Sequence, residues 1–265
     1  MATILLFCCG WLYIHADGPA HMPLPAMDQD GTSAAAASPD LLVRRVVQGF
    51  PREPLHIRGD FTLRRRRGVV MQEQPFEMTV HWGGDPMQAR YAVLDEESGR
   101  PLEEMRLVRR RDAAPEWTYR HGIPLRQAEP PNLFESIRGT DVSWMDLSLS
   151  FLWWTGGRLV GEERIRGYPC HIVEIPAPQH EREANEGANR AYAKVRLWID
   201  HENHMLLQAK GYDRDGEPIR RMWVRSLQKI DDRWMIKDME VQQYPAVHRT
   251  KLTIREVDTP DDNAL

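Results

Sequence analysis

Residues 76–82, Phe-Glu-Met-Thr-Val-His-Trp, decide the fold class because they alternate strictly between apolar and polar side chains. In a strand, alternate side chains point to opposite faces. The apolar set on one face would be Phe76, Met78, Val80 and Trp82. Alternation of this length is typical of a strand buried on one side. The stretch therefore predicts a sheet with an apolar inner face.

The same alternation recurs further along the chain, at 195–199, 222–224 and 252–254. Turn signals rich in Gly, Asp and Asn separate these runs, as at 82–85 and 213–216. Strands joined by such short turns are antiparallel neighbours, because a parallel pair needs a crossover of about a dozen residues or more. We expect about nine to eleven strands in all. The chain has no alternation of strands with long helices, which excludes the doubly wound nucleotide-binding folds.

Two segments break the alternation and predict helices. Asp40 is an N-cap candidate for the first helix, which Gly49 and Pro51 end. The second helix is predicted over 141–154, with Thr140 or Asp141 as its cap. One face of this helix would be apolar, formed by Trp144, Leu147, Phe151 and Trp154 with Leu152 beside them. The alternation of residues 147–151 fits a strand as well.

A sheet with one apolar face needs a cover, because it cannot bury that face alone. A strongly curved antiparallel sheet wrapped around one to three short helices meets this need with the elements expected here. We therefore predict an α+β fold, an incomplete β-barrel with helices inside it or across its mouth. The folded part is predicted to be a single domain over residues 40–260, followed by a tail at 261–265.

The N-terminus carries a short apolar run, Ile4–Ile14, which ends at His15. Eleven residues match the core of a signal peptide and are too few to span a bilayer unaided. We expect residues 1–16 to be a signal peptide or a short anchor; the alternative is an apolar tip without a role. Residues 17–39 are rich in Pro and Ala and predict a disordered linker.

The charge of the chain argues against some classes of partner. Its formal net charge is −4, whereas a nucleic-acid-binding domain is usually basic, so we expect no nucleic-acid partner. The run Arg64–Arg67 is the one charge cluster of note. It fits an edge strand protected against aggregation, and also contact with anionic lipid headgroups, since Arg matches phosphate in a bidentate fork.

The sequence contains no convincing catalytic or metal-binding pattern. His201 and His204 are three residues apart in a predicted turn, whereas the zinc-protease motif needs two His four apart on a helix. Cys170 lies in a predicted strand, where a buried and inert thiol is expected despite the adjacent His171. We expect no enzyme, no cofactor, no metal and no catalytic residue. A hydrolase using His201, His204 or Cys170 is the least favoured alternative.

Five motifs, in the same order, resemble a known family. They are Gly139–Leu147 (Gly-Thr-Asp-Val-Ser-Trp-Met-Asp-Leu), Tyr168–Ile175, Lys194–Asp200, Gly211–Gly216 and Arg249–Ile254. Together they resemble the outer-membrane lipoprotein-sorting proteins, the LolA-like family, over about residues 40–258. Trp144 and Met145 depart from the Tyr and Glu of that signature.

The resemblance implies an exported chain and an incomplete β-barrel lidded by helices. In that family the barrel encloses a hydrophobic cavity that shields the acyl chains of lipoproteins, loaded by an inner-membrane transporter and unloaded by an outer-membrane receptor. The residues predicted to line cavity and lid are Trp144, Leu147, Phe151, Leu152, Trp154, Phe76, Met78, Val80 and Trp82. The nine Trp and twelve Met suit a cavity wall, and they suit an ordinary core equally.

The leading hypothesis is a monomeric periplasmic carrier of lipoprotein acyl chains or lipid. The alternative is a non-catalytic interaction module of the envelope with the same fold. Lipid uptake by the purified protein would distinguish the two.

Overall fold

A single antiparallel sheet of thirteen strands dominates the part of the chain that the structure describes. The structure is a computed structural model and describes residues 38–260 except 112, 186–189 and 231–232. The strands are β1 (Leu55–Arg65), β2 (Val70–His81), β3 (Met87–Leu94), β4 (Pro101–Arg109), β5 (Glu116–His121), β6 (Arg126–Ala128), β7 (Arg158–Ile165), β8 (Tyr168–Pro176), β9 (Lys194–Asp200), β10 (Leu206–Tyr212), β11 (Pro218–Ile230), β12 (Arg233–Gln243) and β13 (His248–Asp258).

The strand order shows how the sheet is assembled. It runs β6-β5-β4-β3-β2-β1-β13-β12-β11-β10-β9-β8-β7, so the one pair that is distant in sequence is β1 with β13. That pair is in register through Phe61 and Leu252. β6 and β7 lie at the two ends and do not pair with each other, so the barrel stays open. The predicted α+β class and incomplete barrel are confirmed.

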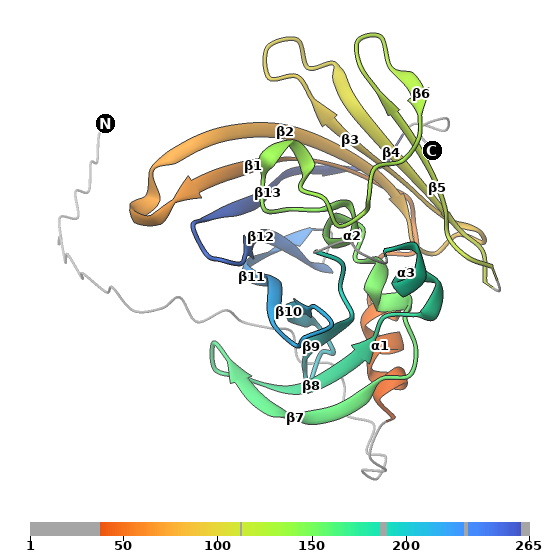
Figure 1. The fold of residues 1–265 in the computed structure, drawn as a ribbon, viewed down its shortest axis with the longest axis vertical. Helices are drawn as coiled ribbons and strands as arrows, with labels where there is room; N and C mark the ends of the chain where they lie inside the picture. Colours follow the sequence, from red (N-terminus) through yellow and green to blue (C-terminus); the bar gives the residue numbers. More distant parts are fainter. Residues whose placement is uncertain (1–37, 112, 186–189, 231–232, 261–265) are drawn as a thin grey trace, which may run out of the picture.

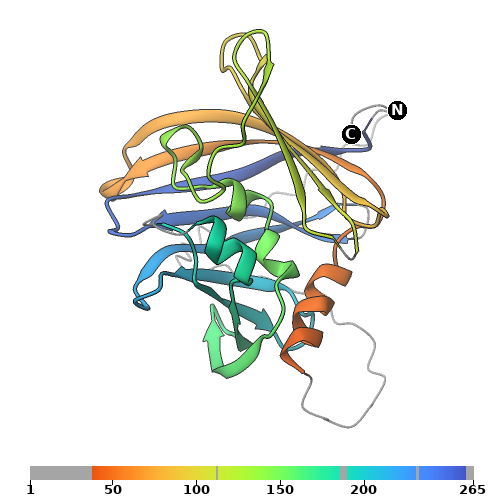
Figure 2. The same cartoon turned by 45° about the vertical axis from the view of Figure 1, so that its right-hand side comes forward.

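The α-helices lie on the concave side of the curved sheet, as Figures 1 and 2 show from two directions. The α-helices are α1 (Pro39–Gln48), α2 (Trp144–Leu147) and α3 (Gln179–Ala184). Three short 3₁₀ helices are η1 (Arg66–Gly68), η2 (Ile137–Gly139) and η3 (Ser150–Trp153). No helix within residues 38–260, as far as they are described, is long and apolar enough to cross a membrane.

The core fills the concave side of the sheet. Alternate residues of β2 face it, with Phe76 and Val80 fully buried, as their spacing predicts. Phe76 stacks on Phe61 of β1 with ring centroids 4.5 Å apart. Leu42 of α1 and Phe151 of η3 belong to the same hydrophobic cluster. The sheet therefore curves around packed side chains that come from the helices as well as from the strands.

The thirteen strands of the described residues exceed the predicted nine to eleven. The least buried strands are β6 and β7 at the two open ends of the sheet, where most residues are exposed on both faces. A strand exposed on both faces shows no alternation of apolar and polar residues. Its sequence therefore carries no strand signal of the kind that identified β2.

The first helix begins slightly earlier than predicted. Ser38, not Asp40, is its N-cap, and the Ser38 hydroxyl accepts a hydrogen bond from the backbone N–H of Leu41. Asp40 lies in the first turn, where its carboxylate accepts a hydrogen bond from the backbone N–H of Gly157 at 2.9 Å. The predicted signal or anchor at 1–16, the linker as far as residue 37 and the tail at 261–265 lie outside the described residues.

Candidate functional site

The segment that covers the core is not the continuous helix predicted over 141–154. It is divided into α2 and η3 by Leu149, whose φ of 52° lies in the left-handed region. Ser148 and Ser150 hydrogen-bond each other at 2.8 Å through their hydroxyls. The Ser148 hydroxyl also donates to the backbone carbonyl of Met145 at 3.3 Å, and such side-chain-to-backbone bonds compete with helical hydrogen bonding. The prediction of one helix, with its four apolar residues sharing a single face, was therefore wrong.

The cap of α2 also differs from the prediction. Ser143, not Thr140 or Asp141, is the N-cap, and its side chain forms a reciprocal capping box with Asp146. The Ser143 hydroxyl accepts from the backbone N–H of Asp146 at 3.2 Å, and the Asp146 carboxylate accepts from the backbone N–H of Ser143 at 3.1 Å. This pairing satisfies two of the N–H groups that a helix start leaves without partners.

Asp141 instead anchors the covering segment to the sheet. It is fully buried, and its carboxylate accepts hydrogen bonds from the backbone N–H of Gln243, the hydroxyl of Thr250 and Nδ1 of His248, all within 3.0–3.1 Å. These partners lie on β12 and β13, about a hundred residues further along the chain. The motif Gly139–Leu147 therefore fixes where the covering segment sits on the sheet.

Asp146 makes a second anchor through a buried charged network. Its Oδ2 lies 3.0 Å from Nη1 of Arg220 on β11, and its Oδ1 accepts from the hydroxyl of Tyr192 at 2.6 Å. Arg220 also donates to the backbone carbonyl of Phe134. Burial lowers the pKa of Arg220, but Asp146 and Tyr192 outweigh this and raise it above its usual value. Arg220 therefore stays charged and fixes the covering segment on β11.

A pocket of about 590 Å³ opens at the rim of the concave face. Four chain segments meet there: the turn between β2 and β3, the residues after β4, η3, and the start of α3. The apolar part of its wall contains Trp82, Met87, Ala113, Ala114, Pro115, Trp153, Trp154 and Pro178. Its charged residues are Asp85, Arg109, Arg110, Arg111, His180 and Glu181.

The residues predicted to line a cavity lie in one region, but only some of them line this pocket. Trp82 and Trp154 line it. The others belong to the hydrophobic core or pack against it and are not part of this pocket's wall: Phe76, Met78, Val80, Trp144, Leu147, Phe151 and Leu152. These side chains pack together on the concave face beneath the helices, and the described pocket lies at the edge of that face.

The sequence reasoning missed most residues of this wall, among them Trp153 and Arg109. Trp153, next to the predicted Trp154, lies under the guanidinium of Arg109 at 4.8 Å from the ring centroid. Nε of Arg109 is buried and has no hydrogen-bond partner among the described residues, and burial lowers the pKa of this side chain. The run of two Trp was the available signal for Trp153. Arg109 was one Arg among many in its region, and only the fold distinguishes it.

Cys170 and the adjacent His171 do not form a catalytic pair. Cys170 and His171 are adjacent on β8 and so point to opposite faces of the sheet. Cys170 is buried in a small cluster with Trp198 and Leu207, and burial raises the pKa of its thiol to about 11. A thiol of that pKa is a poor nucleophile at neutral pH. The expected inert role of Cys170 agrees with this environment.

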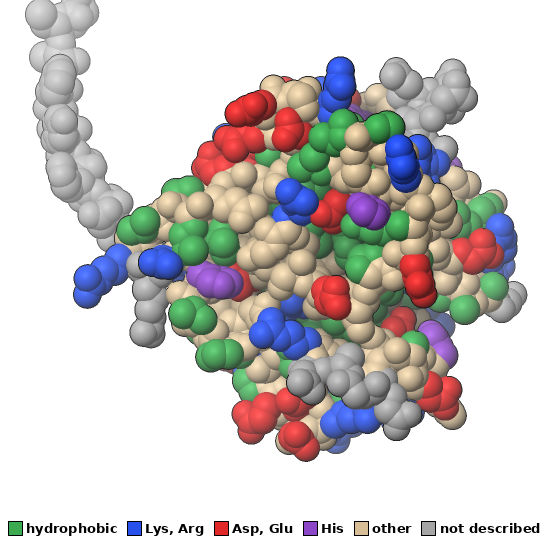
Figure 3. All heavy atoms as spheres, turned by 45° about the horizontal axis from the view of Figure 1, so that its top comes forward, with side chains coloured by type: hydrophobic (Ala, Val, Ile, Leu, Met, Phe, Trp, Pro, Cys, Tyr) green, Lys and Arg blue, Asp and Glu red, His purple; other side chains and the backbone are tan. Residues whose placement is uncertain are grey.

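The surface shows no field of a single sign on the face drawn in Figure 3, where acidic and basic side chains are interspersed. Many of the arginines are paired with carboxylates, for instance Arg90 with both Glu77 and Glu104 at 2.7 Å. A nucleic-acid-binding surface would instead present a basic stripe.

Comparison with known proteins places the chain in a family. A family model described as "Uncharacterized protein" matches residues 124–263, more than half of the chain. The chain belongs to this family. No curated protein matches it. Several solved structures share its LolA-like fold.

Three solved structures illustrate this likeness. A DUF1329 family protein from Desulfovibrio piger has a TM-score of 0.68 at 18% identity, with 86% of this chain and 93% of that chain covered. A domain named for outer-membrane lipoprotein sorting, from Vibrio parahaemolyticus, has a TM-score of 0.67 at 12% identity, with 86% of this chain and 93% of that chain covered. A LolA superfamily protein from Nitrosomonas europaea has a TM-score of 0.64 at 12% identity, with 85% of this chain and 95% of that chain covered. None of the three is named as an enzyme, and the predicted LolA-like resemblance is confirmed at the level of the fold.

Proposed function

We propose that this protein is a periplasmic carrier that shields the acyl chains of lipoproteins or lipids during sorting to the outer membrane. The observation that supports the proposal most directly is the pocket at the rim of a LolA-like sheet, with three Trp side chains in its wall. The same proposal holds that the chain is exported and monomeric. An inner-membrane transporter would load it, and an outer-membrane receptor would unload it.

The pocket has the size of a ligand site, and three Trp side chains lie beside the charged residues of its wall. Its volume of about 590 Å³ lies within the roughly 300–1,000 Å³ of ligand sites. Each methylene removed from water contributes about 0.8 kcal/mol, so an apolar concavity suffices to hold a chain without specific polar contacts. Trp82, Trp153 and Trp154 supply flat apolar surface. Trp82 is itself supported by Phe50, with ring centroids 4.9 Å apart.

Arg109 is suited to hold an anionic headgroup at the pocket. Its guanidinium is partly desolvated and its Nε lacks a partner within the described chain, so a phosphate or carboxylate would supply the missing acceptor. By contrast, Arg110 already pairs with Glu116 and Arg111 with Asp85. We therefore assign recognition of the headgroup to Arg109.

The deeper apolar residues would form the floor of an enlarged site. Trp144, Phe151 and Leu152 lie on the covering segment, and Phe76 and Val80 lie on the sheet behind it. A longer chain would reach them only if η3 moved away from the core. Leu147 and Met78 belong to the same floor.

The proposal is tested by titrating the full chain with two fluorescent probes of equal acyl length, one a carboxylate and one an uncharged ester. Trp153→Ala should weaken binding of both probes about tenfold, equivalent to about 1.4 kcal/mol. Arg109→Gln should weaken only the carboxylate, again by about tenfold. Trp223→Ala is the matched control, because Trp223 lies on β11, stacks with Arg221 and is not in the pocket wall.

Failure of the wild-type chain to bind either probe would refute the carrier proposal and favour the interaction module. Equal losses in Trp153→Ala and Trp223→Ala would refute the assignment of the pocket.

A further inference from the structure

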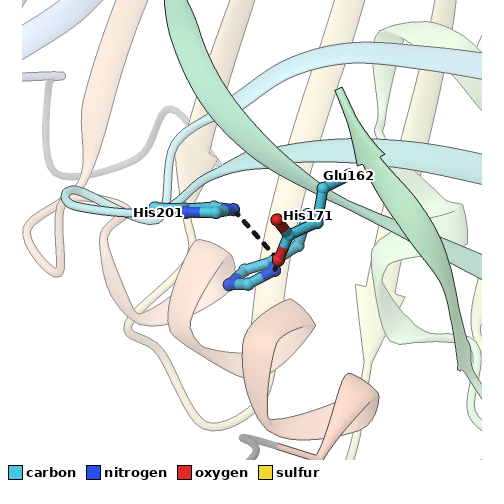
Figure 4. A group of neighbouring side chains, drawn as sticks. All are labelled: Glu162, His171 and His201. Carbon is cyan, nitrogen blue, oxygen red and sulfur yellow. Dashed lines mark ion pairs between the residues drawn. The ribbon is translucent and has the colours of Figure 1, made fainter. Parts of the chain in front are cut away.

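A second cluster of side chains lies away from the pocket, at the edge of the sheet formed by β7 and β8. Glu162 of β7, His171 of β8 and His201 of the turn between β9 and β10 converge there, as Figure 4 shows. One ligand atom from each lies within 4.8 Å of the other two. We propose that these three residues bind a divalent transition-metal ion of the Zn²⁺ class.

The backbone places the three side chains together by independent constraints. Glu162 and His171 are directly opposite each other in the antiparallel pairing of β7 with β8, so their side chains lie on the same face. The backbone N–H of His201 donates to the carbonyl of Pro169 at 3.0 Å, which ties the turn to β8. The buried carboxylate of Asp200 accepts from the backbone N–H of Asn203 at 2.7 Å and holds the turn in shape. The cluster is thus preorganised.

The two imidazole donor atoms have ion-pair contacts with Glu162 but no hydrogen bond. Nδ1 of His171 and Nε2 of His201 are shielded from solvent, and neither makes a hydrogen bond with a described residue. Each lies close to the same carboxylate oxygen, Oε1 of Glu162, at 3.4 Å and 3.8 Å respectively. Buried polar atoms are normally hydrogen-bonded. An ion between the three groups would satisfy both nitrogens together.

The distances are close to those of a metal site. Zn–N and Zn–O bonds of about 2.0–2.2 Å in a tetrahedron place donor atoms about 3.3 Å apart. The two nitrogen–oxygen separations, 3.4 Å and 3.8 Å, need to close by at most about half an ångström, and all three donor atoms already lie within 4.8 Å of one another. The two imidazole rings stack with centroids 3.8 Å apart, and the Glu162 side chain is largely exposed and free to adjust.

The ligand set selects the kind of metal and its coordination. Two imidazoles and one carboxylate suit Zn²⁺, Cu²⁺ or Ni²⁺, whereas Mg²⁺ and Ca²⁺ prefer oxygen ligands alone. Three protein ligands leave one position of a tetrahedral ion for water or an external ligand. His204 does not complete the set, since its Nε2 lies 2.9 Å from Nη1 of Arg45 on α1. The bound ion would clamp the edge strand β7 to the turn between β9 and β10.

This inference is independent of acyl binding and is tested with the metal alone. The full chain, stripped with chelator, is titrated with ZnCl₂ by calorimetry in the presence of excess Mg²⁺. We expect one Zn²⁺ per chain, with affinity reduced about 100-fold or more in His171→Ala and in His201→Ala, beyond the roughly 10–100-fold cost of losing an outer-shell partner. His121→Ala is the matched control, because His121 is an exposed residue of β5 outside the cluster.

Glu162→Gln provides a variant on an exposed edge strand, where the substitution leaves the fold intact. It should reduce Zn²⁺ affinity about tenfold or more, since the amide is neutral. Co²⁺ should give the visible absorption of a four-coordinate site in wild-type protein and lose it in the His variants. Equal Zn²⁺ affinity in wild type, Glu162→Gln and His171→Ala would overturn the proposal, as would competition by Mg²⁺.

Discussion

Replacing Asp146 by Ala should be among the most destabilising single changes in this protein. The substitution leaves Arg220, 1% exposed, without the carboxylate 3.0 Å from its Nη1. It also removes the acceptor of the Tyr192 hydroxyl and one half of the capping box with Ser143. Removing one partner of a buried ion pair costs about 3–5 kcal/mol, because the remaining charge stays buried without compensation. That loss is a large part of a domain's free energy of unfolding, which is about 5–15 kcal/mol.

The assay is urea unfolding followed by Trp fluorescence. With a slope of about 3 kcal/mol per molar urea, the expected loss shifts the midpoint down by roughly 1–1.7 M. Asp60→Ala is the matched control: its partner Arg255 lies 2.7 Å away but is largely exposed, and such pairs contribute about 0–1 kcal/mol.

A double variant separates the cost of the orphaned charge from the loss of packing. In Asp146→Ala with Arg220→Met no charge remains buried, so we expect it to be more stable than Asp146→Ala alone. A loss in Asp146→Ala no larger than that of Asp60→Ala would refute the reasoning. So would a double variant whose loss equals the sum of the two single losses.

Two further predictions concern the sheet. Burial raises the pKa of Glu174, but hydrogen bonds from Arg196 and its neighbouring cations outweigh this and lower the pKa from 4.5 to about 2. The contribution of Glu174 to the free energy of unfolding is therefore complete above pH 4.5 and disappears as the pH falls towards 2. Glu174→Gln should therefore lower the free energy of unfolding by about 1.5–3 kcal/mol at pH 7 and by progressively less below pH 4.5. Urea unfolding across pH measures this, and a difference between variant and wild type that does not change with pH would contradict the prediction. Gly211→Ala should cost about 1–3 kcal/mol because the new Cβ would lie 2.3 Å from the ring of Tyr192. Gly49→Ala, whose Cβ would lie no closer than 3.3 Å to any neighbour, is its control, and equal urea midpoints for the two variants would show that the ring can move.

The architecture was predictable where one face of a strand is buried. The alternation of Phe76, Met78 and Val80 reproduces the inner face of β2, because burial on one side imposes a period of two. The exposed strands β6 and β7 bury neither face and left no such pattern. Local sequence therefore indicated the curved sheet and underestimated its extent.

The candidate sites were less predictable because they depend on contacts between distant residues. The break at Leu149 lies between Ser148 and Ser150, whose polar side chains an apolar periodicity does not register. His171 and His201 are thirty residues apart, and only the register of β8 with its neighbours brings them together. The sequence reasoning weighed His201 with His204 and expected no metal, since it compared spacing along the chain and not across the sheet.

We propose that this LolA-like fold holds an acyl chain at the rim pocket. Mass spectrometry of organic extracts from the full chain purified out of a native envelope tests this, alongside Trp153→Ala and the control Trp223→Ala. We expect acylated molecules in near-equal amounts with wild type and Trp223→Ala, and a clear depletion with Trp153→Ala. Wild-type protein free of acyl species, or equal amounts in all three samples, would contradict acyl binding at this pocket.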